Sequence, residues 1–226
     1  MKKAIIYLII ALFLALVVQP NIGTKLTKGN QRVPTNTKNG TPTTNETIEY
    51  KSDTKNITIC LDAANNNNEE TGSDINLEIT EILGESLENA GYNIVYTRTG
   101  NSTLTNDERV QIANSENADY LISITTNSDT DSLQRGYSIM SQEKKKLITL
   151  SENISQQIES LNYTVFQGID SDHYANFPIL ANSDIPAILI EVGYTSNSSD
   201  LSNLSNESVQ NKIAEAITKG IVNTSK

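Results

Sequence analysis

The residues from Asn56 onward predict one α/β domain, with a mainly parallel twisted sheet and helices on both faces. Two observations support this fold class. Short apolar segments rich in β-branched residues alternate with longer segments of helical periodicity, and each apolar segment is nearly continuous. In addition, 226 residues with 37% hydrophobic content can bury one sizeable core. No internal repeat is visible, which disfavours solenoids and propellers.

The first predicted strand, ITICLD at 57–62, is a short apolar run that ends in a polar loop. A helix is predicted next at 73–91, with Ser73 or Asp74 as candidate N-cap and Gly91 as the stop. Its apolar face contains Ile75, Ile79, Ile82 and Ala90.

The later segments continue the alternation of strands and helices. Further strands are predicted at 92–98, 119–125, 136–141 and 186–191, and further helices at 106–117, 143–161 and 208–222. Function in such sheets collects at the carboxyl ends of the strands. The regions of interest are therefore 62–68, 125–128 and 191–195.

The N-terminal segment 1–20 has the composition of an export signal. Lys2 and Lys3 precede an uncharged apolar run at 4–18, and no small-residue cleavage site follows it. We interpret 1–20 as a signal-anchor that holds the rest of the chain outside the cytoplasm, in contact with the membrane. The alternative is a cleaved signal peptide and a secreted protein.

Residues 21–55 form a polar segment that is predicted to be a disordered linker, and 56–226 is the globular domain. Residues 1–55 contain eight Lys/Arg and three Asp/Glu, which leaves nine Lys/Arg and 24 Asp/Glu for 56–226. So acidic a domain is a poor partner for nucleic acid, whereas the basic segment suits an anionic membrane or wall surface. The single cysteine, Cys60, lies in the first strand and is interpreted as a core residue.

Six short motifs occur in order along the domain, at 62–67, 72–77, Thr97 with Arg98, Arg109 with 113–114, 123–127, and 186–197. They resemble the patterns D-P-G-H-G-G, E-x-D-x-x-L, T-R, L-x-x-R with A-N, S-I-H-x-N and P-x-x-L-V-E-x-G-F-x-S-N. These patterns are typical of the zinc-dependent N-acetylmuramoyl-L-alanine amidases, which cut peptidoglycan between muramic acid and the stem peptide. The resemblance covers about 56–222 and implies the amidase fold.

The resemblance also implies four site positions, and three of them depart from the family. The positions of the zinc ligands are occupied by Asn65, Gly72 and Thr125, while Glu191 matches the general base. A catalytic zinc site needs three ligands drawn from His, Asp, Glu and Cys. The sequence therefore predicts no metal site and no cofactor, and Glu191 is interpreted as a vestigial base.

Several other polar side chains are candidate replacement ligands or binding groups. Asp62, Glu69, Glu70 and His173, the one histidine, could in principle assemble a different site with Glu191. We interpret Asp62 instead as a turn-stabilising carboxylate that accepts backbone N–H groups, and Arg98 and Arg109 as structural. Asn65, Asn127 and His173 are the candidate substrate-binding residues.

Three functions remain open from the sequence. The favoured hypothesis is an envelope pseudoenzyme that binds peptidoglycan or a partner envelope protein without hydrolysis. The second is an active amidase with a non-standard metal site. The third is a structural envelope protein with an empty cleft.

Overall fold

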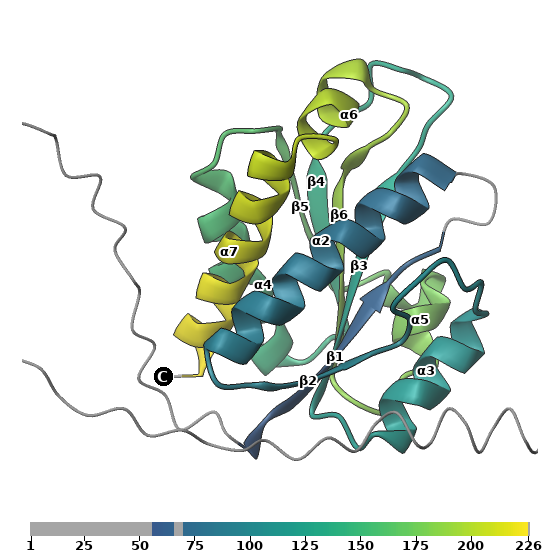
Figure 1. Ribbon diagram of the computed structural model, residues 1–226, viewed down its shortest axis with the longest axis vertical. Coiled ribbons are helices and arrows are strands. Elements are labelled where there is room, and N and C mark those ends of the chain that lie inside the picture. Colours follow the sequence, from purple (N-terminus) through teal and green to yellow (C-terminus); the bar gives the residue numbers. More distant parts are fainter. Residues whose placement is uncertain (1–55, 66–69, 226) are drawn as a thin grey trace, which may run out of the picture. The chain divides into compact units, whose positions relative to one another are not determined.

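The computed structural model describes residues 56–65 and 70–225, which form an α/β domain around one six-stranded sheet (Figure 1). The order of strands across the sheet is β2-β1-β3-β6-β4-β5. Their bounds are β1 Thr58–Ala63, β2 Asn93–Tyr96, β3 Tyr120–Asn127, β4 Tyr137–Ser141, β5 Phe166–Asp170 and β6 Ala187–Tyr194.

The sheet is mainly parallel, as predicted, and has one antiparallel junction. Strands β2, β1, β3 and β6 run in the same direction, whereas β4 pairs antiparallel with β6 and β5 pairs parallel with β4. The carboxyl ends of β1, β3 and β6 therefore meet at one edge of the sheet. The ends of β4 and β5 point the opposite way.

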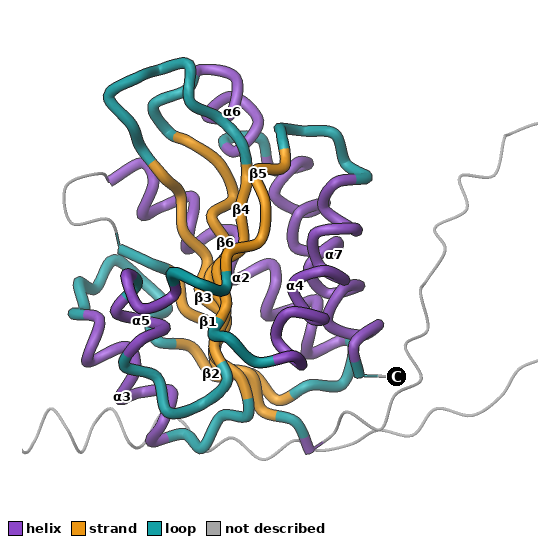
Figure 2. Tube along the Cα trace, turned by 180° about the vertical axis from the view of Figure 1, so that it is seen from behind, coloured by secondary structure: helices purple, strands orange, loops and turns teal. Residues whose placement is uncertain are grey.

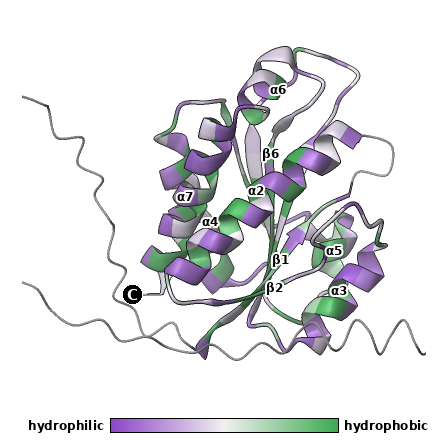
Figure 3. Ribbon diagram, viewed as in Figure 1, coloured by the Kyte–Doolittle hydropathy of each residue, from purple (hydrophilic) through white to green (hydrophobic). Residues whose placement is uncertain are grey.

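Helices cover both faces of the sheet (Figure 2). The helix bounds are α2 Glu70–Asn89, α3 Asn106–Ser115, α4 Lys145–Glu159, α5 Pro178–Ala181, α6 Ser198–Leu204 and α7 Glu207–Thr224. Helices α2, α4 and α7 pack on one face over the larger core cluster, and α3 and α5 pack on the other over a smaller one. The outward sides of the larger helices are hydrophilic (Figure 3).

Local sequence signals explain several helix ends. Thr105 and Glu108 form a reciprocal capping box at the start of α3. Gly91, just beyond the end of α2, has a φ of +94°, a conformation that residues with a Cβ avoid. The predicted stop of this helix is therefore confirmed to within two residues.

Two predicted boundaries are wrong. Helix α2 begins at Glu70, so Ser73 and Asp74 lie inside the helix rather than at its N-cap. Strand β6 continues to Tyr194, so Glu191 lies within the strand and not at its last position. The strand passes through Gly193, whose φ of +152° suits a residue without a Cβ.

Four short elements were not predicted. They are β5, α5, α6 and the 3₁₀ helix at Tyr174–Asn176. Each has seven residues or fewer and shows too little periodicity to identify from sequence.

Cys60 is fully buried and unpaired, which confirms its place in the core. Burial raises the pKa of its thiol to about 12, so the thiol stays protonated near neutral pH. Within 56–65 and 70–225, no helix is both long enough and apolar enough to cross a membrane. The predicted signal-anchor at 1–20 and the linker at 21–55 lie outside the described residues.

Candidate functional site

Asp62, in the second half of β1, is the centre of a buried polar cluster. Its carboxylate accepts hydrogen bonds from the hydroxyls of Thr97 at 2.7 Å and Ser123 at 2.6 Å. Arg109 donates to the same carboxylate at 2.6 Å and forms a buried ion pair with it. Asp62 was expected to stabilise a turn through backbone N–H groups; instead it lies within β1 and binds side chains from three other parts of the chain.

Arg98, which follows β2, joins the start of α2 to the end of β1. Its guanidinium donates to the backbone carbonyls of Ala63 at 2.7 Å and Ser73 at 2.9 Å, with further bonds to Ala64 and Gly100. The side chain is almost completely buried, and burial lowers the pKa of the guanidinium. These contacts support the structural role predicted for Arg98.

Glu191 lies at the centre of a row of three residues that crosses the sheet. Thr125 on β3 is its register partner on one side, and Ser138 on β4 is its partner on the other. Register partners project from the same face of a sheet. The Ser138 hydroxyl donates a 2.8 Å hydrogen bond to the Glu191 carboxylate.

The Glu191 carboxylate is partly buried and has no ion-pair partner among the described residues. Burial raises the pKa of Glu191, while hydrogen bonds from the side chains of Ser138 and Asn127 lower it in part. The two donors are neutral and leave the negative charge unbalanced. Because the side chain is partly exposed, its oxygens can also accept a proton or a hydrogen bond from a ligand.

The backbone around Glu191 is fixed by a second buried carboxylate, Asp200. This carboxylate accepts hydrogen bonds from the N–H groups of Gly136 at 2.8 Å and Tyr194 at 3.0 Å. Asp200 therefore ties the beginning of β4 to the end of β6. Strands β4 and β6, which carry Ser138 and Glu191, therefore cannot separate at this end without breaking these bonds.

The segments that carry Asn65 and Gly72 meet close to the row. The N–H of Ala64 donates to the carbonyl of Ile124, next to Thr125, at 2.9 Å. Asn76 on α2 donates to the carbonyl of Ala64 at 2.8 Å. The end of β1, the start of α2 and the end of β3 are therefore held together beside Glu191, and Gly72 is buried there.

His173 does not belong to this group. His173 follows β5, whose last residue, Asp170, lies level with Leu189 on β6. Strand β5 runs antiparallel to β6, so the chain after Asp170 continues away from Glu191, toward the opposite edge of the sheet. The His173 side chain is 69% exposed and its Nδ1 lies 3.0 Å from a carboxylate oxygen of Asp170. Asn127, by contrast, contacts Glu191 directly.

Among residues 56–65 and 70–225, no three His, Cys, Asp or Glu side chains are grouped closely enough to hold a metal ion. Glu70 begins α2, and Glu69 lies outside the described residues. The row offers hydroxyl and carboxylate groups to a ligand, and Asn127 beside it adds an amide; such groups suit hydrogen bonding to sugars or peptides.

Sequence reasoning missed Ser138. Its segment was predicted as a strand, but nothing in the sequence indicated that this strand runs antiparallel beside β6. An antiparallel neighbour brings Ser138 level with Glu191. Only knowledge that β4 pairs antiparallel with β6 would have identified this contact.

Comparisons with known proteins give a consistent result. A family model described as N-acetylmuramoyl-L-alanine amidase matches residues 35–223. The chain is 34% identical over 151 residues to the uncharacterised protein YqiI of Bacillus subtilis strain 168, covering 66% of this chain and 71% of YqiI.

Two relatives of solved structure share the fold. The N-acetylmuramoyl-L-alanine amidase of Clostridium difficile 630 is 27% identical, with a TM-score of 0.67 over 75% of this chain and 96% of that one. The CwlD amidase of Clostridioides difficile, solved in complex with the GerS lipoprotein, is 29% identical, with a TM-score of 0.63 over 75% of this chain and 98% of that one.

Proposed function

The chain belongs to the N-acetylmuramoyl-L-alanine amidase family, and from this premise we propose that it binds peptidoglycan in the cell envelope without hydrolysing it. Peptidoglycan is the polymer on which the family acts, and the fold and the Glu191 position are retained.

The residues at the family's metal positions do not fit zinc. Asn65 offers a neutral amide, Thr125 a hydroxyl that would have to ionise, and Gly72 has no side chain. Without a Lewis acid, Glu191 would have to deprotonate an ordinary water, and no cation would stabilise the developing oxyanion. We therefore expect amide hydrolysis to be absent.

The observation that carries the binding proposal is the row of Thr125, Glu191 and Ser138. A partly buried carboxylate with a raised pKa, flanked by hydroxyl and amide groups, is a set of hydrogen-bonding groups without a reactive centre. Sugar hydroxyls and peptide amides are the partners that such groups recognise. Peptidoglycan contains both.

We further propose that residues 4–18 anchor the chain in the membrane, so that the domain faces the wall. The apolar run and its basic flank support this location. A secreted form, released by signal cleavage, is the alternative. Both forms bring the domain to the same polymer.

Two other functions are supported by specific observations. The CwlD amidase is known in complex with a lipoprotein, so a protein of the envelope is a second candidate ligand for this chain. Hydrolysis through a non-standard site is the other, because a relative of solved structure is itself an N-acetylmuramoyl-L-alanine amidase.

The first experiment measures metal content and stem-peptide release by the purified full chain. We expect neither stoichiometric zinc nor release. The triple variant Asn65→His, Gly72→Glu, Thr125→His should gain zinc, because it restores three ligands. Stoichiometric zinc and peptide release by the unaltered chain would instead establish the enzyme.

The second experiment measures sedimentation of the full chain with purified sacculi. Glu191→Ala should reduce binding several-fold, whereas Glu152→Ala, the same change on the exposed surface of α4, should not. Salt must be varied in parallel, because residues 1–55 are basic and can bind an anionic wall by charge alone. Equal binding by both variants would remove the Glu191 row from the proposal.

A further inference from the structure

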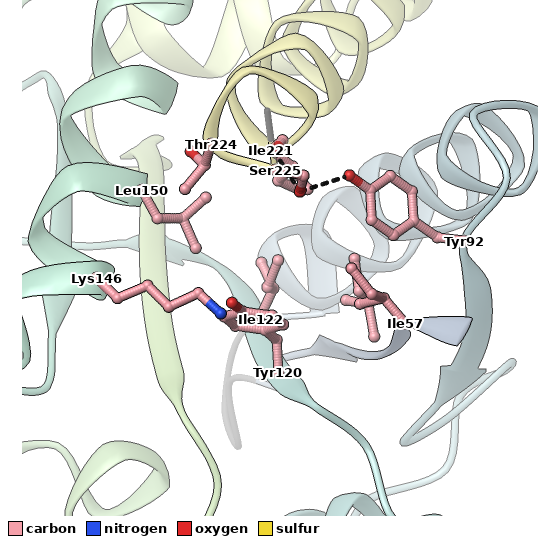
Figure 4. Close-up of a pocket in the computed structure, with 10 residues that line it drawn as sticks. Ile57, Tyr92, Tyr120, Ile122, Lys146, Leu150, Ile221, Thr224 and Ser225 are labelled. Atoms are coloured by element: carbon pink, nitrogen blue, oxygen red, sulfur yellow. Dashed lines mark hydrogen bonds between the residues drawn. The ribbon is translucent and has the colours of Figure 1, made fainter. Parts of the chain in front are cut away.

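An apolar pocket of about 250 Å³ lies at the edge of the sheet opposite to the carboxyl ends of β1, β3 and β6. Figure 4 shows the residues that line it. Residues from the starts of β1 and β3 form its floor, and the start of α4 and the end of α7 form its walls. Ten residues line it: Ile57, Ile59, Tyr92, Tyr120, Ile122, Lys146, Leu150, Ile221, Thr224 and Ser225.

Polar groups occur only at a few places in this pocket. The Tyr92 hydroxyl is hydrogen-bonded to Ser225 at 3.0 Å, and the Lys146 ammonium lies 4.7 Å from the centre of the Tyr120 ring. Thr224 adds a hydroxyl, which is bonded to the carbonyl of Gly220, and the other five residues of the lining are aliphatic. The pocket is thus suited to apolar side chains near a positive charge, and it is smaller than a typical pocket for a drug-sized ligand, which begins at about 300 Å³.

We propose that this chain fills the pocket itself, with Ile48 and Tyr50 from the segment that precedes β1. These residues lie outside the described part of the chain. They are the two large apolar side chains between Val33 and Ile57. Because they are two positions apart, an extended segment would present both on the same side.

The chain length permits this contact. Ile57 lines the pocket, and Tyr50 precedes it by seven positions, which span at most about 25 Å when extended. The residues between them, KSDTKN at 51–56, include Ser, Asp and Asn, which favour turns. A turn within 51–56 would let the segment fold back toward the pocket, and seven positions are enough to cover the short distance that remains.

Charge also favours this occupant. Lys144, Lys145 and Lys146 are exposed at the beginning of α4, beside the pocket. The segment 47–53 contains Glu49 and Asp53 against one Lys51. A net negative segment therefore meets a positive rim.

Docking of this segment would determine the orientation of the domain relative to the chain that precedes it. The pocket lies at the opposite edge of the sheet from Glu191, so the row would face away from the docked segment. Docking does not depend on whether peptidoglycan binds at Glu191.

The test uses the full chain with a photoreactive benzoylphenylalanine in place of Tyr50. Irradiation followed by peptide mapping should give cross-links within one molecule to the peptides that contain Tyr120, Lys146 to Leu150, or Ile221 to Ser225. The same group in place of Val33 should give none of these. Cross-links to other surfaces, to lipid, or between two copies would overturn the proposal.

A thermal measurement provides an independent check. The double variant Ile48→Ser, Tyr50→Ser should lower the melting temperature of the full chain by about 4 °C, because two apolar side chains lose their buried position. The matched control Ile22→Ser, Leu26→Ser should leave it within about 1 °C. Equal melting temperatures for the two double variants would contradict docking.

Discussion

Asp62 and Glu191 are both carboxylates in the central part of the same sheet, but their surroundings differ. Asp62 is fully buried and receives two hydroxyl donors and a guanidinium. Glu191 is partly exposed, and its donors are neutral. The fold therefore balances the charge of Asp62 with the Arg109 guanidinium, whereas no described cation pairs with Glu191.

The largest expected effect is on the Asp62 side of this comparison. Asp62→Ala leaves the Arg109 guanidinium buried without its partner, so the free energy of unfolding should fall by about 3–5 kcal/mol. Urea unfolding followed by circular dichroism measures this. The comparison would break if Asp62→Ala lost less than Glu191→Ala.

A smaller loss is expected for Arg98→Lys. An ammonium cannot reach the carbonyls of Ala63, Ser73 and Gly100 together, as the guanidinium does. We expect a loss of about 1–3 kcal/mol in the free energy of unfolding, because buried carbonyls lose charged donors. The exposed Arg135→Lys is the matched control, and an equal change in both would contradict the structural role of Arg98.

Glu191→Gln should sharpen the contrast, with an effect below about 1 kcal/mol at neutral pH, since a Gln side chain can still accept from Ser138. The folded pKa of Glu191 is raised, so the stability linked to its protonated form is present below the unfolded pKa of about 4.3. That stability is lost as the pH rises through the folded pKa. Unfolding measured between pH 4 and 8 should therefore show a smaller decline in Glu191→Gln than in the unaltered chain; parallel curves would argue against a raised pKa.

The smallest effect is expected for Ser138→Ala, which removes a donor that favours the charged form of Glu191. The pKa of Glu191 should rise further, while the free energy of unfolding changes little. Carbon-detected NMR titration of the glutamate carboxyl resonances measures the pKa. Thr130→Ala, in an exposed loop, serves as the control, and a lowered pKa in Ser138→Ala would contradict the hydrogen-bond assignment.

The sequence predicted every long element, because an apolar strand or an amphipathic helix carries its own periodicity. Strand β1 and helix α7 differ from their predicted bounds by two residues or fewer. The start of α2 was missed because Ser and Asp are typical N-cap residues, whereas Ser73 and Asp74 lie inside the helix. Strand β5 has five residues, too few for a recognisable periodic pattern, and it forms a strand through its pairing with β4.

The site was predictable only in part. Asp62 and Glu191 could be identified from strand ends and motifs, because both lie in apolar runs where a carboxylate is unusual. The contact between Ser138 and Glu191 depends on strand pairing across 53 positions, which local patterns do not encode. The isolation of His173 has the same cause, because the reversed direction of β4 and β5 carries its loop to the other edge.

The place of β6 in the sheet has a consequence for how the chain is made. This strand joins β3 to β4, yet it is the last strand in the sequence, and α7 follows it to cover α2 and α4. A nascent chain that ends before residue 187 holds two separate groups of strands, each with an open edge where wrong pairing can start. The complete six-stranded sheet therefore cannot form until β6 has been synthesised, and a chain that stops before residue 187 lacks the strand that joins the two groups.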